Sequence, residues 1–157
     1  MKQRLLYILI IAAVFFAPVE TMNIGNLRPV QVVAIYQDGP QLVIETDTQD
    51  RGVGVTPQLA LQNLKDTANG IIYLDTAEYV LMAEEAQQSV EALRGTLRGS
   101  AKVCKMQGKV KLENAADILA VHSKLPKLKH WNMGMELPVL GVFEDREIFL
   151  KKVENNA

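Results

Sequence analysis

Apolar and polar positions alternate in blocks along the chain, and the first blocks after residue 30 predict a β-hairpin. Residues 30–36 are apolar and rich in β-branched side chains, which is typical of a strand. Residues 37–40 (Gln-Asp-Gly-Pro) predict a turn, because glycine tolerates the positive φ that tight hairpin turns need. Residues 42–46 form the second predicted strand, and the polar segment 47–54, with its two glycines, predicts a loop.

Helices and strands then alternate. Thr56 and Pro57 mark the start of a helix, because threonine caps free backbone N–H groups and proline fits the first turn. Gly70 is its stop signal, and the mostly apolar run 77–83 predicts a central strand buried on both faces. The other expected elements are a helix from residue 84 to 98, a strand at 101–106, a helix starting at 113 or 114 and ending before Pro126, and, beyond an irregular stretch at 127–138, a closing hairpin of strands 139–143 and 147–153.

This order, ββ-α-β-α-β-α-ββ, predicts an α+β (mixed α/β) fold in which helices pack on a mixed sheet. The 157 residues are enough for one domain and hardly for two. We expect a leader at residues 1–19, a linker at 20–29, a single extracytoplasmic domain at 30–153 and a flexible tail at 154–157.

The leader has the features of an export signal. Lys2 and Arg4 precede the uncharged apolar run 5–17. Ala17 is the best last residue for signal peptidase, but Phe15 occupies the other position that should be small, so an uncleaved or slowly cleaved membrane anchor is favoured. A cleaved leader would give a secreted protein, and a buried core helix is the structural alternative. The residues expected in the membrane are Leu5, Leu6, Ile8, Leu9, Ile10, Ile11, Val14, Phe15 and Phe16.

The net charge of -1 results from cancellation between two unlike segments. Residues 20–91 carry a balance of -8, and residues 94–129 carry +7. Two solvated faces that neutralise each other are one interpretation, and a basic surface for anionic lipid headgroups or an acidic partner is the other. Nucleic acid is not an expected partner, because the overall charge is near zero. The candidate basic residues are Arg94, Arg98, Lys102, Lys105, Lys109, Lys111, Lys124, Lys127 and Lys129.

Catalytic patterns are weak, and we expect neither a cofactor, nor a metal, nor a small-molecule substrate. His122 falls on the apolar stripe of a predicted helix, while His130 has no second ligand at metal-binding spacing. Cys104, the single cysteine, is expected to fill the core, and it could be a nucleophile only with a histidine brought in by the fold. Trp131, with Met133 and Met135, either covers the open end of the core or forms an exposed patch for a partner.

One series of segments resembles a known family. Strand, Asp-Gly turn and strand at 32–46 are followed by Ala60-Leu61, by Tyr-Leu-Asp-Thr-Ala-Glu-Tyr-Val-Leu-Met-Ala-Glu-Glu-Ala at 73–86, and by Ala-Asp-Ile-Leu at 116–119. This resembles the N-terminal domain of the Ger(x)C family, the C subunits of spore germinant receptors, over residues 30–125. Members of that family are longer and usually carry a lipobox cysteine, so the chain resembles a distant or reduced member.

The resemblance implies a non-enzymatic, membrane-associated protein that assembles with integral-membrane germinant receptor subunits during germination. No catalytic residue is carried over by it. The alternative is a generic cell-envelope α/β binding module unrelated to germination, and an enzyme is the least favoured class. In each of the first two cases we expect the domain on the extracytoplasmic side of the cell membrane.

Overall fold

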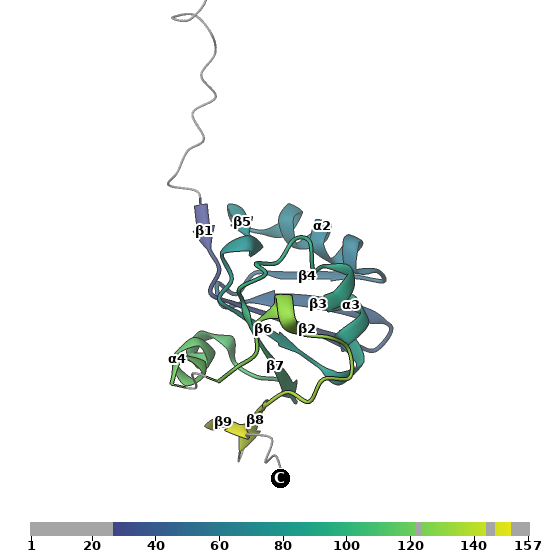
Figure 1. Ribbon diagram of the computed structural model, residues 1–157. Coiled ribbons are helices and arrows are strands. Elements are labelled where there is room, and N and C mark those ends of the chain that lie inside the picture. The colour runs from purple at the N-terminus through teal and green to yellow at the C-terminus, as the bar shows by residue number, and fades with distance from the viewer. Residues whose placement is uncertain (1–26, 122–123, 144–146, 152–157) are drawn as a thin grey trace, which may run out of the picture.

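The structure is a computed structural model that describes residues 27–121, 124–143 and 147–151, in which helices pack on a mixed sheet (Figure 1). This arrangement confirms the predicted α+β fold. The seven strands of the main sheet are β2 (Val32–Asp38), β3 (Gln41–Thr46), β4 (Arg51–Gly54), β6 (Tyr79–Met82), β7 (Lys102–Gln107), β8 (Val139–Phe143) and β9 (Glu147–Lys151). Their order across the sheet is β4-β3-β2-β6-β7-β8-β9. β2, β6, β7 and β8 are mutually parallel, whereas β3, β4 and β9 run antiparallel to their neighbours.

Both predicted hairpins and the buried central strand are confirmed. β2 and β3 pair out to Asp38 and Gln41, so Gly39 and Pro40 form the turn, and Gly39 adopts a φ of +60°. Every residue of β6 is buried, because strands flank it on both sides and both faces of the sheet are covered here. Such two-sided burial explains the unbroken apolar run.

The first helix, α2 (Pro57–Thr67), begins where the sequence predicts. Thr56 is its N-cap, and the hydroxyl oxygen of Thr56 accepts a hydrogen bond from the backbone N–H of Leu59 at 3.3 Å. The expected loop at 47–54, however, is wrong for its second half, because Arg51–Gly54 is strand β4. The two glycines in β4 are the reason: a Cβ at Gly52 or Gly54 would lie within 2.5 Å of α2 backbone atoms, so the helix can lie this close only on glycine.

The predicted linker is also wrong at its end, because Leu27–Pro29 forms strand β1. β1 pairs in parallel with β5 (Ile71–Tyr73) in a separate two-stranded sheet. Neither strand was predicted, since three residues are too few to show an alternating pattern. The 3-10 turn η2 (Leu74–Thr76) then leads from β5 to β6.

The second and third helices are shorter than the sequence predicts. Residues 84–98 contain the 3-10 turn η3 (Glu84–Ala86), helix α3 (Gln87–Ala92) and then turns. Gly95 weakens the helix, and the hydroxyl of Thr96 donates to the carbonyl of Leu93, which ends the helical hydrogen bonding. The third helix consists of η4 (Leu112–Asn114) and α4 (Ala115–Ala120), and a 3-10 turn, η5 (Leu128–His130), follows in the predicted irregular stretch.

The helices lie on two faces of the sheet. Gly52 and Gly54 face α2, and Glu45, which pairs with Arg51, faces the opposite side and lines a cleft with Leu112 of η4. In Figure 1, α4 correspondingly lies across the sheet from α3. The chain between α4 and β8 passes the start of β7, where the segment around Lys127 pairs with it.

Several expectations concern residues outside the described ranges: the leader and anchor at residues 1–19, most of the linker, His122 and the tail at 154–157. None of the helices in the described part of the chain combines the length and the apolar character needed to cross a bilayer.

Candidate functional site

The nine candidate basic residues are spread over positions 94–129, and eight of them fall into three groups in the fold. The ninth, Lys124, is exposed between α4 and η5. Arg94 is used inside the protein: its guanidinium donates to Glu91 and to the carbonyls of Leu128 and Trp131 at 2.9 and 2.8 Å. It also lies over the ring of Trp131, 5.4 Å from the centroid. Arg94 therefore holds the segment around η5 against α3, and its side chain is half-buried.

The second group, Lys105, Lys109 and Lys111, meets acidic side chains. Lys105 and Lys109 lie at the carboxyl ends of the parallel strands, whereas Lys111 lies in a cleft that extends to the loop after β3. Lys105 forms an ion pair with Glu84. Lys109 lines two neighbouring clefts there, of about 550 and 330 Å³, which also contain Asp38 and Glu45. Lys111 and Glu113 complete the smaller cleft. Here the charges of the acidic and basic segments offset each other, as the interpretation of mutually neutralising faces requires.

Tyr36 lies in the larger of these two clefts. Its hydroxyl donates a 2.7 Å hydrogen bond to the carboxylate of Glu45, its neighbour on strand β3. Partial burial, followed by this hydrogen bond, raises the pKa of Tyr36 to about 12. The phenol therefore stays protonated and acts as a hydrogen-bond donor at neutral pH.

The third group, which we call the basic edge, consists of Arg98, Lys102, Lys127 and Lys129. All but Lys102 are exposed, and Lys102 lies with its Nζ 5.4 Å from the centroid of the Tyr79 ring. Among the described residues the ion pairs involve none of these four side chains. One acid, Glu78, lines the shallow cleft between Arg98 and Lys102, so the basic edge keeps an excess of positive charge.

Backbone hydrogen bonds assemble the basic edge from three segments. The N–H of Lys102 donates to Glu78 at 2.7 Å, and Lys102 bridges to Lys127 in antiparallel fashion. The N–H of Lys129 donates to the carbonyl of Gly99 at 2.9 Å, which brings η5 beside the turn that carries Arg98. The basic edge therefore lies along the amino ends of the parallel strands, away from the group at their carboxyl ends.

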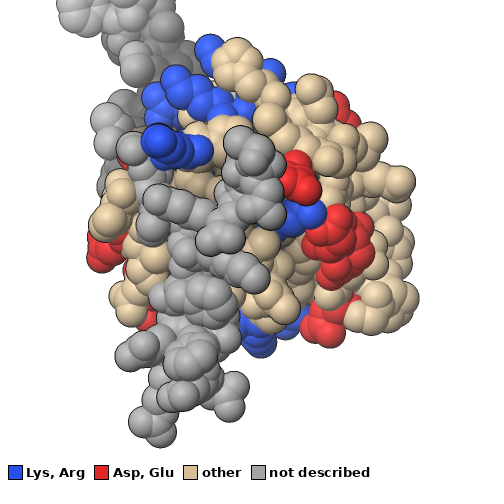
Figure 2. All heavy atoms as spheres, turned by 60° about the horizontal axis from the view of Figure 1, so that its bottom comes forward, with Lys and Arg blue, Asp and Glu red and all other residues tan. Residues whose placement is uncertain are grey.

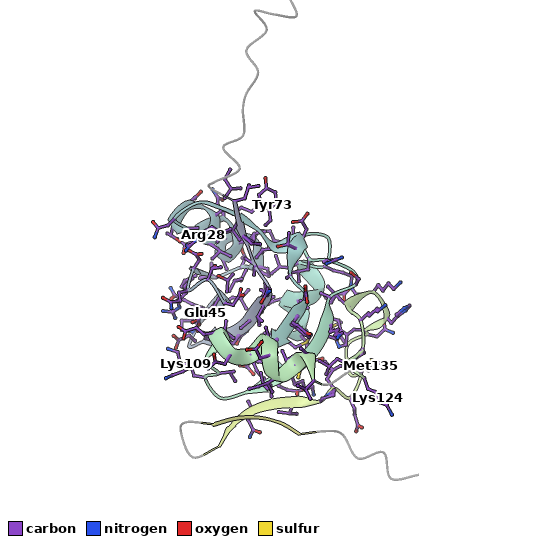
Figure 3. The ribbon with its side chains drawn as sticks, turned by 90° about the vertical axis from the view of Figure 1, so that its left-hand side faces the viewer. Arg28, Glu45, Tyr73, Lys109, Lys124 and Met135 are labelled. Atoms are coloured by element: carbon purple, nitrogen blue, oxygen red, sulfur yellow. The ribbon has the colours of Figure 1, made fainter. Side chains whose placement is uncertain are left out.

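The figures show the same separation of charge. Figure 2 shows a group of basic side chains at the upper left of the face it presents and most of the acidic ones at the right, with further basic side chains at the centre and the bottom. In Figure 3, Lys124, which is exposed and precedes Lys127 by three residues, projects from the opposite side of the domain to Lys109. A single continuous basic surface over residues 94–129, as the sequence suggested, is therefore divided in the fold.

The side chains considered for catalysis do not converge among the described residues. Cys104 is 1% exposed, and its thiol donates to the carbonyl of Pro138 at 2.9 Å. Burial raises its pKa to about 12, so it fills the core as an unreactive thiol. His130 is exposed in η5. Within the described ranges, no three His, Cys, Asp or Glu side chains are grouped so that they could hold a metal ion.

The predicted cluster of Trp131, Met133 and Met135 divides into a buried and an exposed part. Trp131 is fully buried and belongs to the core. Met133 and Met135 are 55% and 42% exposed beyond it. The tryptophan thus covers the end of the core, and only the two methionines are available to a partner.

One group of polar residues was missed by the sequence analysis. Arg28 on β1 donates to both carboxylate oxygens of Asp50, at 3.3 and 3.2 Å, and Thr48 donates to the same carboxylate at 2.7 Å. Asp50 is 8% exposed, which makes it one of the few buried polar residues. Arg28, a charged residue just before the apolar run 30–36, is a weak signal in the sequence. Its partner Asp50 is 22 residues away, so spacing alone could not predict the contact.

Comparison with known proteins gives no match: no family model fits the chain, and neither the curated proteins nor the solved structures contain a significant relative.

Proposed function

We propose that the protein is a non-enzymatic, membrane-tethered extracytoplasmic domain that acts in the assembly of a protein complex, in the manner of the germinant receptor C subunits that it resembles. The observation that carries the proposal is the way strand β1 is built into the domain. β1 begins at residue 27, so that nine residues, 18–26, separate it from the apolar run 5–17. Contacts with β5 and with Asp50 hold it in place.

Two sets of contacts fix β1. Its backbone pairs with β5 in parallel register from Leu27 to Pro29. Its Arg28 side chain reaches the buried carboxylate of Asp50 in the loop between β3 and β4. In Figure 3, Arg28 lies at the same end of the domain as Tyr73 of β5. A short strand outside the main sheet contributes little to the core, so its attachment serves to fix where the chain leaves the domain.

This attachment limits how far the domain can be from an anchor. Nine extended residues span at most about 32 Å. A compact domain of this size is about 35 Å across. An anchor at residues 5–17 would therefore hold the β1 end of the domain within one domain diameter of the bilayer, where it can contact membrane-embedded subunits.

Cell fractionation tests the proposal. Tagged full-length protein, produced in a spore-forming bacterium, should appear in the membrane fraction and should be digested by protease added to protoplasts. A matched variant with Ile10→Arg and Val14→Arg should leave the membrane fraction, since charges within the run oppose insertion. Full-length wild-type protein recovered in the cytosol would refute the proposal.

The germination role requires a second experiment. Solubilised membranes from sporulating cells should yield the tagged protein together with the integral-membrane germinant receptor subunits, detected by antibodies against them. The Asp50→Ala variant, which releases Arg28, should reduce this recovery if the fixed position of β1 matters for assembly. A membrane-bound protein that never co-purifies with these subunits would favour the generic envelope binding module instead.

A further inference from the structure

We propose that the basic edge, formed by Arg98, Lys102, Lys127 and Lys129, binds the anionic headgroups of the phospholipid bilayer and so sets the orientation of the domain on the membrane. This inference rests on the proposed function, because it needs the domain to be tethered. It identifies the surface that the tether brings to the bilayer.

The position of the basic edge relative to β1 is the first argument. A row of backbone hydrogen bonds crosses the amino ends of the strands: Glu78 donates to Gln31 at 2.9 Å, and Lys102 donates to Glu78 at 2.7 Å. Lys127 is next in this row, through its bridge to Lys102. At about 4.8 Å per strand, Lys127 is roughly 15 Å from Gln31, which lies two residues after the end of β1.

The length of the tether is the second argument. The hairpin turn at Gly39 follows the carboxyl end of β2, about 20 Å from the amino end of that strand. A tether of nine residues, shorter than the domain is wide, brings the amino ends of the strands to the bilayer more readily than the carboxyl ends. The surface that faces the membrane therefore includes the edge where Lys102 and Lys127 lie.

The charge distribution is the third argument. Three of the four side chains are exposed, and the ion pairs among described residues leave all four uninvolved. By contrast, Lys105 is paired with Glu84, and Lys109 lies among Asp38, Glu45 and Glu84. In the basic edge, four basic side chains thus accompany one acid of the cleft between them, Glu78, which leaves an excess of positive charge. Clustered basic side chains of this kind are attracted by an anionic leaflet.

The two aromatic rings next to the basic edge, those of Tyr79 and Trp131, are buried and so cannot stack on the bases of a nucleic acid. Tyr79 is 5% exposed and lies beneath Lys102, and Trp131 is fully buried. Bases of single-stranded nucleic acid bind best where exposed aromatic rings accompany the cations. A lipid headgroup needs only the cations, so the bilayer is the better partner for this edge.

Contact quenching in vesicles tests the inference with the full-length protein. A fluorophore is attached at Ser100→Cys, within the basic edge, or at Gln41→Cys beside the hairpin turn; both positions are exposed. The native Cys104 is buried, and its raised pKa keeps it unlabelled at neutral pH. The vesicles contain a nitroxide-headgroup lipid as contact quencher, in phosphatidylcholine alone or mixed with phosphatidylglycerol.

The expected result is stronger quenching at residue 100 in the phosphatidylglycerol vesicles and no change at residue 41. Replacing both Lys127 and Lys129 by glutamine should weaken the association of the domain with the bilayer about 25-fold, at about fivefold for each charge. The matched control replaces Lys105 and Lys109 by glutamine, which changes the net charge equally at the carboxyl ends of the strands, and it should leave the quenching unchanged. Circular dichroism verifies that both variants fold.

The failures of the two proposals are distinguishable. If the protein floats with both kinds of vesicle, but quenching at residue 100 is independent of phosphatidylglycerol or of Lys127 and Lys129, the basic edge does not bind lipid and the tether proposal survives. If the protein floats with neither kind of vesicle, the tether itself is absent and both proposals fail. Equal effects of the two double variants would show a response to net charge alone, and would also overturn the assignment.

Discussion

The close approach of α2 to β4 makes a substitution at Gly52 a sharp test of the fold. A Cβ at this position would lie 2.3 Å from the carbonyl oxygen of Ala60, 2.4 Å from Cβ of Leu64 and 2.5 Å from its backbone nitrogen. Ordinary contacts begin near 3.4 Å, so the helix must move away by about 1 Å. Two of the three atoms belong to the backbone, and a change of side-chain rotamer therefore cannot relieve the clash.

We expect Gly52→Ala to destabilise the protein by about 2–3 kcal/mol, the upper part of the range for overpacking a close contact. For a domain of this size that corresponds to a fall in Tm of about 10 °C. Thermal unfolding of the full-length protein in mild detergent, followed by circular dichroism, measures it. Gly95→Ala is the matched control, since nothing lies within 4 Å of its Cβ position and its Tm should hardly change. Equal Tm values for the two variants would refute the close packing of α2 on β4.

Four further predictions concern the side chains of Cys104, Thr56 and Asp50. Cys104, whose pKa is about 12 in the fold, is ionised to only ~10⁻⁴ at pH 8 against ~10⁻¹ in the unfolded chain, so a thiol reagent should label the native protein about a thousandfold more slowly. Because its pKa is raised on folding, its contribution to stability should be full below pH 9 and fall as the pH rises toward 12, a dependence that Cys104→Ala should lack in urea titrations. Thr56→Ala should cost about 1 kcal/mol in urea unfolding, and Thr56→Ser should cost less, because serine keeps the N-cap hydroxyl. Asp50→Ala should cost about 2 kcal/mol and speed hydrogen exchange in β1, whereas Asp47→Ala should leave the Arg28 contact intact.

Elements set by local sequence were predictable. The turn at Gly39 needed only a residue that tolerates positive φ, and it was placed correctly. The start of α2 needed only Thr56 and Pro57, and the buried strand at Tyr79–Met82 needed only its unbroken apolar run. In each case, the information lies within a few neighbouring residues, so no knowledge of the tertiary structure was required.

Elements that depend on a distant partner were not predictable. Gly52 and Gly54 look like loop residues until α2 is known to pack on them. β1 has three residues and is stabilised by β5, more than forty residues away in the chain, so its own pattern carries no signal. α3 ends early through the hydroxyl of Thr96, a local cue that the apolar stripe outweighed in the sequence analysis.

The arrangement of the basic residues also depends on distant contacts, but one local signal, the alternation of side chains in strand β7, predicts part of it. Lys102 and Lys105 are three residues apart in β7, and side chains at that spacing in a strand point to opposite faces. The alternation alone therefore predicts that the basic segment cannot form one continuous surface. That Arg94 would be used against Trp131 could not be foreseen, because the two residues meet only when the segment after α4 returns to α3.

The basic edge is therefore a property of the folded chain rather than of a basic segment. Lys102 and Lys127, 25 positions apart, become neighbours because the chain between α4 and β8 pairs with the start of β7 before it turns at η5. The same turn brings Lys129 to Gly99. A partner that requires these four charges together will bind only the native domain, and unfolding will abolish the binding although every charge remains. Salt should weaken the same binding through screening, without any unfolding, so the two losses can be separated by circular dichroism.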